Sequence, residues 1–195
     1  MRQRAWWLVA IVAGLLLMMA STHRLTAPAE PRAQNGPGQF DAGRAKARLA
    51  RVLEDQAPHP ADTAASDGVR DRLVEQLRMM GLQPRVDDRF ACNGLFKQRG
   101  VACARVRNVL VTIGPAGGRH LLINSHYDSV PVGPGASDAG LGVATMLEVA
   151  GLLKDRRLAR PVTFLFNEGE ELGLVGARAF LDGDPLAARV DSLIN

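Results

Sequence analysis

The residue types best suited to chemistry lie in three short segments of the 195-residue chain. These segments, each with its candidate residues, are LLINSHYDS with His126 and Asp128, GASDAG with Asp138, and FLFNEGEELG with Glu170 and Glu171. A hydrolytic metal centre needs neutral imidazole and ionised carboxylates as ligands, together with one unligated carboxylate that serves as a general base. The three segments supply such a set, so we predict a metal site wherever the fold brings them together.

The spacing of these residues indicates how the roles divide. Asp128, two residues after His126, can accept the proton of the second ring nitrogen and so fix the metal-binding tautomer. Successive side chains diverge from an extended or turn backbone, so that one of the adjacent Glu170 and Glu171 can bind metal while the other faces the substrate as general base. Asp138 is a further ligand candidate, in a Gly-rich turn that permits close backbone approach.

Clustering of acidic side chains is itself an indication of a cation. The carboxylates expected to converge are those of Asp128, Asp138, Glu168, Glu170 and Glu171. Converging carboxylates repel one another unless a cation neutralises them. Taken singly, His126 is more often a solvated loop histidine, and the pair Glu170 and Glu171 is more often a charged surface turn. Nucleophilic alternatives are weak, because Ser125 and Ser129 lack the GxSxG setting and the glycines lack the lysine of a phosphate loop.

Apolar runs and turn signals predict the elements that must position these segments. Strands are expected at residues 86–90, 106–113, 121–124 and 162–166, with a further apolar run at 192–195. Helices are expected at residues 41–56, capped by Asp41, at 64–80, ended by Gly81, and at 141–154 and 177–181. Strands that alternate with helices predict an α/β fold, in which ligands gather at the carboxyl ends of the strands. The candidate residues follow two such strands or precede a helix, so they should converge on one crevice.

The composition is that of a globular domain without a basic binding face. Hydrophobic residues make up 47% of the chain and charged residues 23%, which is ordinary for one main core. The formal net charge is +4, but four arginines and one glutamate before Phe40 supply three of these charges. The rest of the chain is close to neutral, so we expect no nucleic-acid partner.

The N-terminus resembles an export signal or a membrane anchor. Arg2 and Arg4 precede an uninterrupted apolar run at residues 5–20. Methionines at the potential cleavage position make a poor signal-peptidase site, so we favour an uncleaved anchor with its N-terminus inside. We therefore expect a signal-anchor or signal peptide at residues 1–25, a flexible Pro- and Gly-rich linker at 26–39, and a domain at 40–195 that lies outside the cytoplasm.

The two cysteines are expected to form a disulfide. Cys92 and Cys103 lie in or beside the connection between the first two predicted strands. A single disulfide fits an exported domain, with two free structural thiols as the alternative. A zinc site built from this pair alone is improbable, because no CxxC or CxxH spacing accompanies it.

The sequence resembles the co-catalytic zinc aminopeptidases of metallopeptidase family 28. The resemblance covers residues 41–195 and rests on HYDSVPVGPGASDAGLGVATMLE followed by FLFNEGEELGLVGARAF. The long N-terminus and the FNEGEELG segment look most like the membrane-associated branch of that family. The resemblance implies a three-layer α/β/α fold with a mixed, mainly parallel sheet, truncated at the C-terminus in this chain.

The same resemblance implies the site and the reaction. His126 would bind one zinc ion, Asp138 would bridge two, and Glu171 would bind the other. Glu170 would be the general base, and Asp128 would orient His126. The implied activity is that of a metallo-aminopeptidase, which hydrolyses N-terminal residues of peptides with metal-activated water.

Departures from the family pattern leave alternatives open. Ala139 stands where the family commonly has a second acidic residue, which concerns the residues around the ligands and not the bridging Asp138. The family also supplies an acidic ligand just after a strand that resembles residues 192–195 and a second histidine much later, and neither is present here. Each zinc ion would therefore lack one protein ligand, so we expect this chain to be the N-terminal portion of a longer enzyme, with its own activity uncertain. The alternatives are a non-catalytic binding ectodomain on the same fold and a glutaminyl cyclase-like acyltransferase with one zinc ion.

Overall fold

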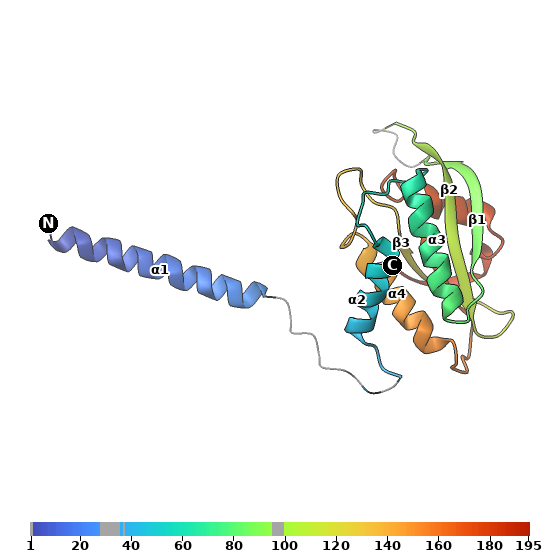
Figure 1. Ribbon diagram of the computed structural model, residues 1–195, viewed down its shortest axis with the longest axis horizontal. Coiled ribbons are helices and arrows are strands. Elements are labelled where there is room, and N and C mark those ends of the chain that lie inside the picture. The colour runs from blue at the N-terminus through green and yellow to red at the C-terminus, as the bar shows by residue number, and fades with distance from the viewer. Residues whose placement is uncertain (1, 28–35, 37, 95–99) are drawn as a thin grey trace. The chain divides into compact units, whose positions relative to one another are not determined.

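The computed structural model describes residues 2–27, 36, 38–94 and 100–195 (Figure 1). The chain divides into two compact units, Met1–Ala33 and Gln34–Asn195. The first unit contains the helix α1 (Arg2–Thr26). Its segment Trp6–Thr26, with 21 residues and a mean hydropathy of 1.8, is long and apolar enough to cross a membrane, a criterion that signal sequences also meet. The anchor therefore stays a prediction, and most of the predicted linker lies outside the described residues.

A five-stranded sheet forms the centre of the second unit, in the order β1-β2-β4-β3-β5. The strands are β1 (Arg85–Cys92), β2 (Cys103–Ile113), β3 (His120–His126), β4 (Val162–Asn167) and β5 (Val190–Ile194). β2 pairs antiparallel with β1 and with β4, whereas β3 pairs parallel with β4 and with β5. Four strands therefore share one direction and β2 opposes them. This confirms the expected mixed and mainly parallel sheet.

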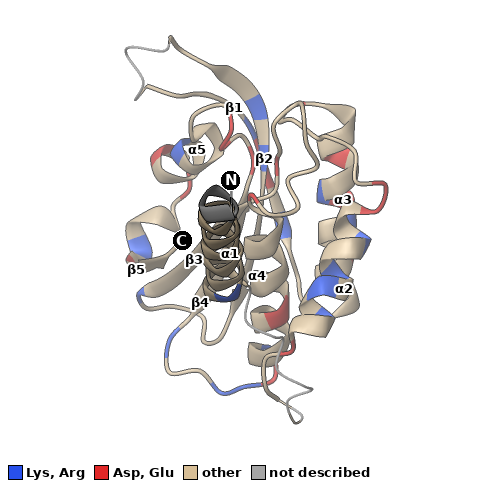
Figure 2. Ribbon diagram, turned by 90° about the vertical axis from the view of Figure 1, so that its left-hand side faces the viewer, with Lys and Arg blue, Asp and Glu red and all other residues tan. Residues whose placement is uncertain are grey.

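Helices cover both faces of the sheet (Figure 2). They are α2 (Ala42–Leu53), α3 (Ala64–Met79), α4 (Gly140–Leu153), α5 (Val175–Gly183) and the 3₁₀ helix η1 (Ala187–Arg189). Val109 and Val111 of β2 pack in the cluster that includes α2, α3 and α4, whereas Leu110 between them packs with Phe180 of α5. This alternation along one strand produces two apolar faces. The three-layer α/β/α arrangement is therefore confirmed.

Local signals in the sequence account for several element boundaries. The Asp41 side chain caps α2 by accepting the backbone N–H of Arg44 at 2.8 Å. Gly81 follows α3 with a φ of +80°, a conformation that glycine adopts without a Cβ clash. β3 extends two residues beyond its predicted end, so that His126 is its last residue. β2 begins at Cys103, three residues earlier than predicted, because its pairing with β1 continues to the end of the hairpin.

A buried carboxylate joins α2 to α4. Glu148 of α4 is 1% exposed, and its carboxylate accepts hydrogen bonds from Arg44 Nη2 at 2.6 Å and from Arg48 Nε at 3.4 Å. The backbone N–H of Asp41 donates to the same carboxylate at 3.2 Å. Glu148 therefore holds a buried charge that depends on Arg44 and Arg48 as partners, and it helps to fix α2 beside the helix that follows Asp138.

A second chain of polar side chains, buried at His120 and Thr163 and exposed at Thr112, crosses three strands at the other end of the sheet. Nδ1 of the buried His120 lies 2.8 Å from Thr163 Oγ1, which in turn lies 2.8 Å from Thr112 Oγ1. Nε2 of His120 has no hydrogen-bond partner within the described parts of the chain. Burial, with a smaller contribution from the positive charge of Arg189, lowers the pKa of His120 below its ordinary 6.5.

We predict that His120 makes the fold less stable in mild acid. Below pH 6.5 the unfolded chain binds a proton at His120 and the folded chain does not, so the free energy of unfolding falls as the pH decreases toward the lowered pKa. The contribution is at most about 1.4 kcal/mol per pH unit. Urea unfolding at pH 7.5 and pH 5.5 should show a smaller loss for His120→Gln, which cannot titrate, than for the wild-type chain. Equal losses in the two proteins would contradict this assignment.

Candidate metal centre

The carboxyl ends of β3 and β4 bring most of the predicted site residues together. His126, the last residue of β3, pairs in register with Asn167, the last residue of β4. Glu170 and Glu171 lie in the loop after β4, with Glu168 and Gly169 between them and the strand, and Asp138 lies in the turn that precedes α4. Because β3 and β4 are parallel, both carboxyl ends lie at the same edge of the sheet, where α/β folds bind their ligands.

His126 directs one ring nitrogen toward the acidic groups. Its Nδ1 lies 3.0 Å from the backbone oxygen of Asp128, which can only accept, so Nδ1 carries a proton in this arrangement. Nε2 lies 3.1 Å from Asp138 Oδ1 and 3.9 Å from Glu170 Oε2. Burial lowers the pKa of His126, but the hydrogen bonds and charge of Asp128, together with Asp138, outweigh it and raise the pKa to about 9.

Glu170 and Glu171 converge on His126. One oxygen of each carboxylate and one ring nitrogen of His126 all lie within 4.8 Å of one another. Nitrogen and oxygen ligands of one tetrahedral zinc ion lie roughly 3.4 Å apart, so the three atoms are close enough to surround a zinc centre after side-chain movements of about an ångström. The expectation that these adjacent carboxylates diverge is wrong, because Glu170 begins a turn in which its carbonyl accepts the N–H of Gly173 at 2.7 Å. The alternation of an extended backbone does not apply there.

Asp138 contacts the site from the solvent side. Its side chain is 84% exposed and reaches His126 Nε2. Burial, followed by the negative charges of Asp138 and Glu170, raises the pKa of Glu171 above its ordinary value. A cation among these carboxylates would relieve that repulsion. Imidazole nitrogen and carboxylate oxygen are donors that zinc binds, and the repulsion among the carboxylates favours a cation between them.

Asp128 has a second function that the sequence does not reveal. Its carboxylate is buried, and Oδ1 lies 3.5 Å from His126 Nδ1. Oδ1 also accepts the backbone N–H of Glu170 at 3.2 Å, and Oδ2 accepts that of Glu171 at 3.2 Å. The predicted proximity to His126 is present, and Asp128 additionally ties the β3 end to the loop after β4.

The inclusion of Glu168 among the converging carboxylates is wrong. This residue is fully buried, and its carboxylate accepts hydrogen bonds from Ser66 Oγ at 2.5 Å and from the backbone N–H groups of Arg107 at 2.7 Å and Asp62 at 3.3 Å. Burial raises the pKa of Glu168, and these hydrogen bonds oppose the rise. Glu168 thus joins the end of β4 to α3 and β2 and does not contribute to the metal centre.

Sequence reasoning missed His59, which supports the loop that carries Asp128. His59 is 2% exposed, and its Nε2 lies 2.8 Å from the backbone oxygen of Tyr127. Its backbone N–H donates to Ser129 Oγ at 2.8 Å, and its carbonyl accepts the N–H of Ser129 at 3.2 Å. The placement of His59 between Pro58 and Pro60 signals an irregular segment, but no local pattern identifies a partner so distant in the chain.

Two cavities flank the loop that carries Glu170 and Glu171. One, of about 540 Å³, is lined in part by His126, Asp138, Asn167 and Glu170. The other, of about 490 Å³, lies between the same loop and Asn93 and Ala102. Both volumes are in the range of small-molecule sites. Glu170 lines both cavities, so its carboxylate is accessible to water and to a bound molecule.

Comparison with known proteins gives a family match and a fold match. Residues 108–195 match the profile described as "Peptidase family M28". A "Vacuolar membrane protease" of Eremothecium gossypii is 32% identical over 160 residues, which are 72% of this chain and 15% of that protein. A "Vacuolar membrane protease" of Schizophyllum commune is 31% identical over 193 residues, which are 96% of this chain and 21% of that protein. The chain therefore spans about a fifth or less of the length of these relatives.

Solved structures share the fold. A glutaminyl cyclase of Porphyromonas gingivalis superposes with a TM-score of 0.67 and 22% identity, covering 79% of this chain and 58% of the other. A zinc aminopeptidase from Bacillus subtilis superposes with a TM-score of 0.68 and 17% identity, covering 82% and 70%. At these identities the likeness is one of fold. It confirms the expected zinc-aminopeptidase-like architecture, and the family match together with the donor set supports zinc dependence.

We predict that Asp128→Asn weakens zinc binding without unfolding the chain. An amide can accept through one oxygen only, so its NH₂ group would face one of the two N–H groups that the carboxylate now satisfies. Outer residues of this kind change metal affinity by about 10- to 100-fold, and competition with a chromophoric chelator would measure the change. Asp155→Asn, at a residue paired with Lys154 on the surface, is the matched control. Equal zinc affinities in the two variants would contradict the role of Asp128.

Proposed function

We propose that this chain supports the zinc-dependent removal of N-terminal residues from peptides. It belongs to peptidase family M28, whose profile residues 108–195 match. The observation that carries the proposal is the convergence of His126, Glu170 and Glu171 within 4.8 Å beside an open cavity. The buried Asp128 holds both the histidine and the loop of the two glutamates. A charged surface turn would not need such an arrangement.

The residues would divide the work as follows. His126 and Glu171 would each hold a separate zinc ion, and Asp138 would bridge the two. Zinc, when bound, supplies a Lewis acid that activates water and polarises a carbonyl group. Glu170 would take a proton from the attacking water and pass it to the leaving amine. Its side chain is 38% exposed, and Oε2 lies 3.9 Å from His126 Nε2, which supports a role at the boundary between metal and substrate.

An aminopeptidase must recognise the free amino group at the N-terminus of its substrate. Asp138 and Glu171 are assigned to zinc in this proposal, so Glu170, which lines both cavities, is the remaining carboxylate that such a group could approach. An exopeptidase that recognises this group would reject a substrate whose amino terminus is acetylated.

We also propose that α1 anchors the domain to a membrane on the side away from the cytoplasm. The relatives of this chain are named vacuolar membrane proteases, and Trp6–Thr26 is long enough to span a bilayer. Arg2 and Arg4 precede this segment, which favours a cytoplasmic N-terminus. The disulfide between Cys92 and Cys103 fits an oxidising compartment.

A glutaminyl cyclase-like acyltransferase with one zinc ion is the second candidate, and a non-catalytic binding domain is the third. The fold of the Porphyromonas gingivalis glutaminyl cyclase supports the second. Cyclisation of an N-terminal glutamine releases ammonia, whereas an aminopeptidase releases a free amino acid. Product analysis together with the number of zinc ions bound per chain separates these two. Zinc binding without either product would favour the binding domain.

We predict that Glu170→Gln abolishes hydrolysis while zinc binding persists. The amide cannot accept the proton of the attacking water, so kcat of the full-length enzyme for aminoacyl 4-nitroanilides should fall at least about 100-fold. Zinc content by atomic emission should stay at the wild-type value. Glu75→Gln, at an exposed position of α3, is the control and should keep full activity. Turnover retained in Glu170→Gln would remove this residue from the mechanism.

A separate comparison tests the substrate class. If the wild-type chain hydrolysed N-acetylated substrates as fast as substrates with a free amino group, an aminopeptidase would be ruled out.

A further inference from the structure

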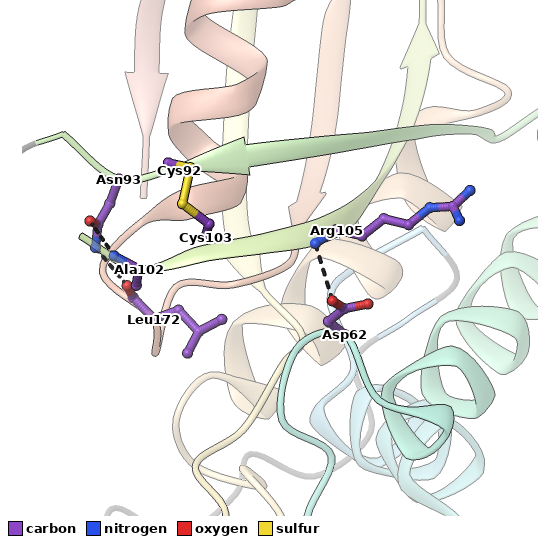
Figure 3. The surroundings of a disulfide bond; sticks show 7 residues. All are labelled: Asp62, Cys92, Asn93, Ala102, Cys103, Arg105 and Leu172. Atoms are coloured by element: carbon purple, nitrogen blue, oxygen red, sulfur yellow. Dashed lines mark hydrogen bonds between the residues drawn. A yellow bond between two sulfur atoms is a disulfide. The ribbon is translucent and has the colours of Figure 1, made fainter.

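The end of the β1–β2 hairpin lies against the loop of the two glutamates (Figure 3). Cys92 and Cys103 are register partners at this end of the hairpin and form a disulfide. Beyond them the hairpin continues for one more pair, because the N–H of Asn93 donates to the carbonyl of Ala102 at 2.9 Å. The disulfide therefore fixes the position of the residue that follows Cys92.

Asn93 uses its side-chain amide to connect the hairpin to the glutamate loop. The residue is 4% exposed, and its Oδ1 accepts the N–H of Ala102 at 3.0 Å. Its Nδ2 donates to the backbone carbonyl of Leu172 at 2.7 Å. Leu172 directly follows Glu171, so this hydrogen bond holds the chain one residue from a carboxylate of the candidate metal centre. Figure 3 shows the amide of Asn93 between these two partners.

The position of the glutamate loop depends on such polar contacts. The loop borders a cavity of about 490 Å³ on one side and one of about 540 Å³ on the other, so that the packing of Leu172 against the apolar cluster of Val106 and Val175 is supplemented by hydrogen bonds to the backbone. Asp128 holds the N–H groups of Glu170 and Glu171. Asn93 holds the carbonyl of Leu172 from the direction of the hairpin. Two elements far apart in sequence thus fix the backbone that carries both carboxylates.

We propose that Asn93 is a positioning residue for Glu170 and Glu171, and that the Cys92–Cys103 disulfide keeps Asn93 in place for this role. This inference rests on the proposed function, because it takes Glu170 and Glu171 to act at a zinc centre. Asn93 itself touches Leu172 and Ala102, and its effect on the metal centre passes through the backbone of the loop. A carboxylate displaced by a fraction of an ångström loses the geometry that zinc requires.

Three variants test separately the two side-chain hydrogen bonds of Asn93 and the disulfide beside it. Asn93→Leu removes both side-chain hydrogen bonds at similar volume. Asn93→Asp keeps the acceptor for the N–H of Ala102 but loses the donor to the Leu172 carbonyl. The double variant Cys92→Ala with Cys103→Ala removes the disulfide without adding polar groups. Gln83→Glu, at an exposed position after α3, is the control for an added negative charge.

Zinc affinity of the whole chain is the first measurement. We expect both Asn93 variants to bind zinc about 10- to 100-fold more weakly than the wild-type chain, as substitutions behind metal ligands do. The double cysteine variant should lose about tenfold, and Gln83→Glu should match the wild-type chain. Wild-type affinity in Asn93→Leu would overturn the proposal. Weak binding confined to Asn93→Asp would also overturn it, because the loss of both hydrogen bonds in Asn93→Leu would then have had no effect.

Two further measurements distinguish positioning from general support of the fold. The visible absorption of Co²⁺ bound in place of zinc depends on coordination geometry, so it should change in Asn93→Leu and stay the same in Gln83→Glu. Amide hydrogen exchange should become faster in residues 169–175 of Asn93→Leu, with exchange in β3 and β4 unchanged. Faster exchange throughout the domain with an unchanged Co²⁺ spectrum would mean that Asn93 only stabilises the fold, and would overturn the proposal.

Failure of the proposed function gives a different result. If the wild-type chain binds neither Zn²⁺ nor Co²⁺, the zinc-dependent function is wrong. Hydrogen exchange in residues 169–175 of the Asn93 and cysteine variants then still decides the positioning role. Exchange that is unchanged from the wild-type chain would overturn that role, and locally faster exchange would support it.

Discussion

The carboxylate of Asp128 is the interaction on which the candidate site depends. It is 1% exposed, and a buried negative charge is costly unless hydrogen bonds and opposite charge satisfy it. The N–H groups of Glu170 and Glu171 and the nearby ring of His126 provide those partners. The cost of burying Asp128 thus selects an arrangement in which the end of β3 and the loop after β4 meet. Without this contact, the pairing of β3 with β4 would bring the two chain segments to the same edge of the sheet but would not orient the imidazole and the two carboxylates toward one another.

The sheet supplies the rigidity that this arrangement requires. β3 and β4 pair in parallel register up to His126 and Asn167, so the two segments leave the sheet side by side. Phe164 and Phe166 of β4 pack in the cluster on one face of the sheet and Leu165 packs in the cluster on the other, so a one-residue shift of register would exchange their packing partners. Repulsion among Asp138, Glu170 and Glu171 acts in the opposite direction, since burial and then the charges of Asp138 and Glu170 raise the pKa of Glu171. The core of the sheet therefore stabilises a cluster of like charges that a free loop would disperse.

Much of this architecture could be predicted from the sequence because it depends on local pattern. Continuous apolar runs predicted β3 and β4, and the capping residue Asp41 predicted the start of α2. The directions of side chains in loops could not be predicted in this way. Glu168 is one residue from β4 and two residues from Glu170, yet it faces Ser66 and the backbone of β2. Glu170 and Glu171 converge because of a turn that their identities do not specify.

Contacts between residues distant in sequence were the hardest to anticipate. His59, Asn93 and Glu148 have no neighbours in sequence that indicate their partners. Those partners lie between 68 and 104 residues away: Tyr127 for His59, Leu172 for Asn93 and Arg44 for Glu148. Each is buried and satisfied by hydrogen bonds to another element, as buried polar groups must be. The disulfide gives one of these contacts a chemical dependence. It forms in oxidising compartments, and the proposed anchor would deliver the domain to such a compartment. On the proposal that Asn93 positions the glutamate loop, oxidation of Cys92 and Cys103 completes the support of the metal centre only after the domain has left the cytoplasm.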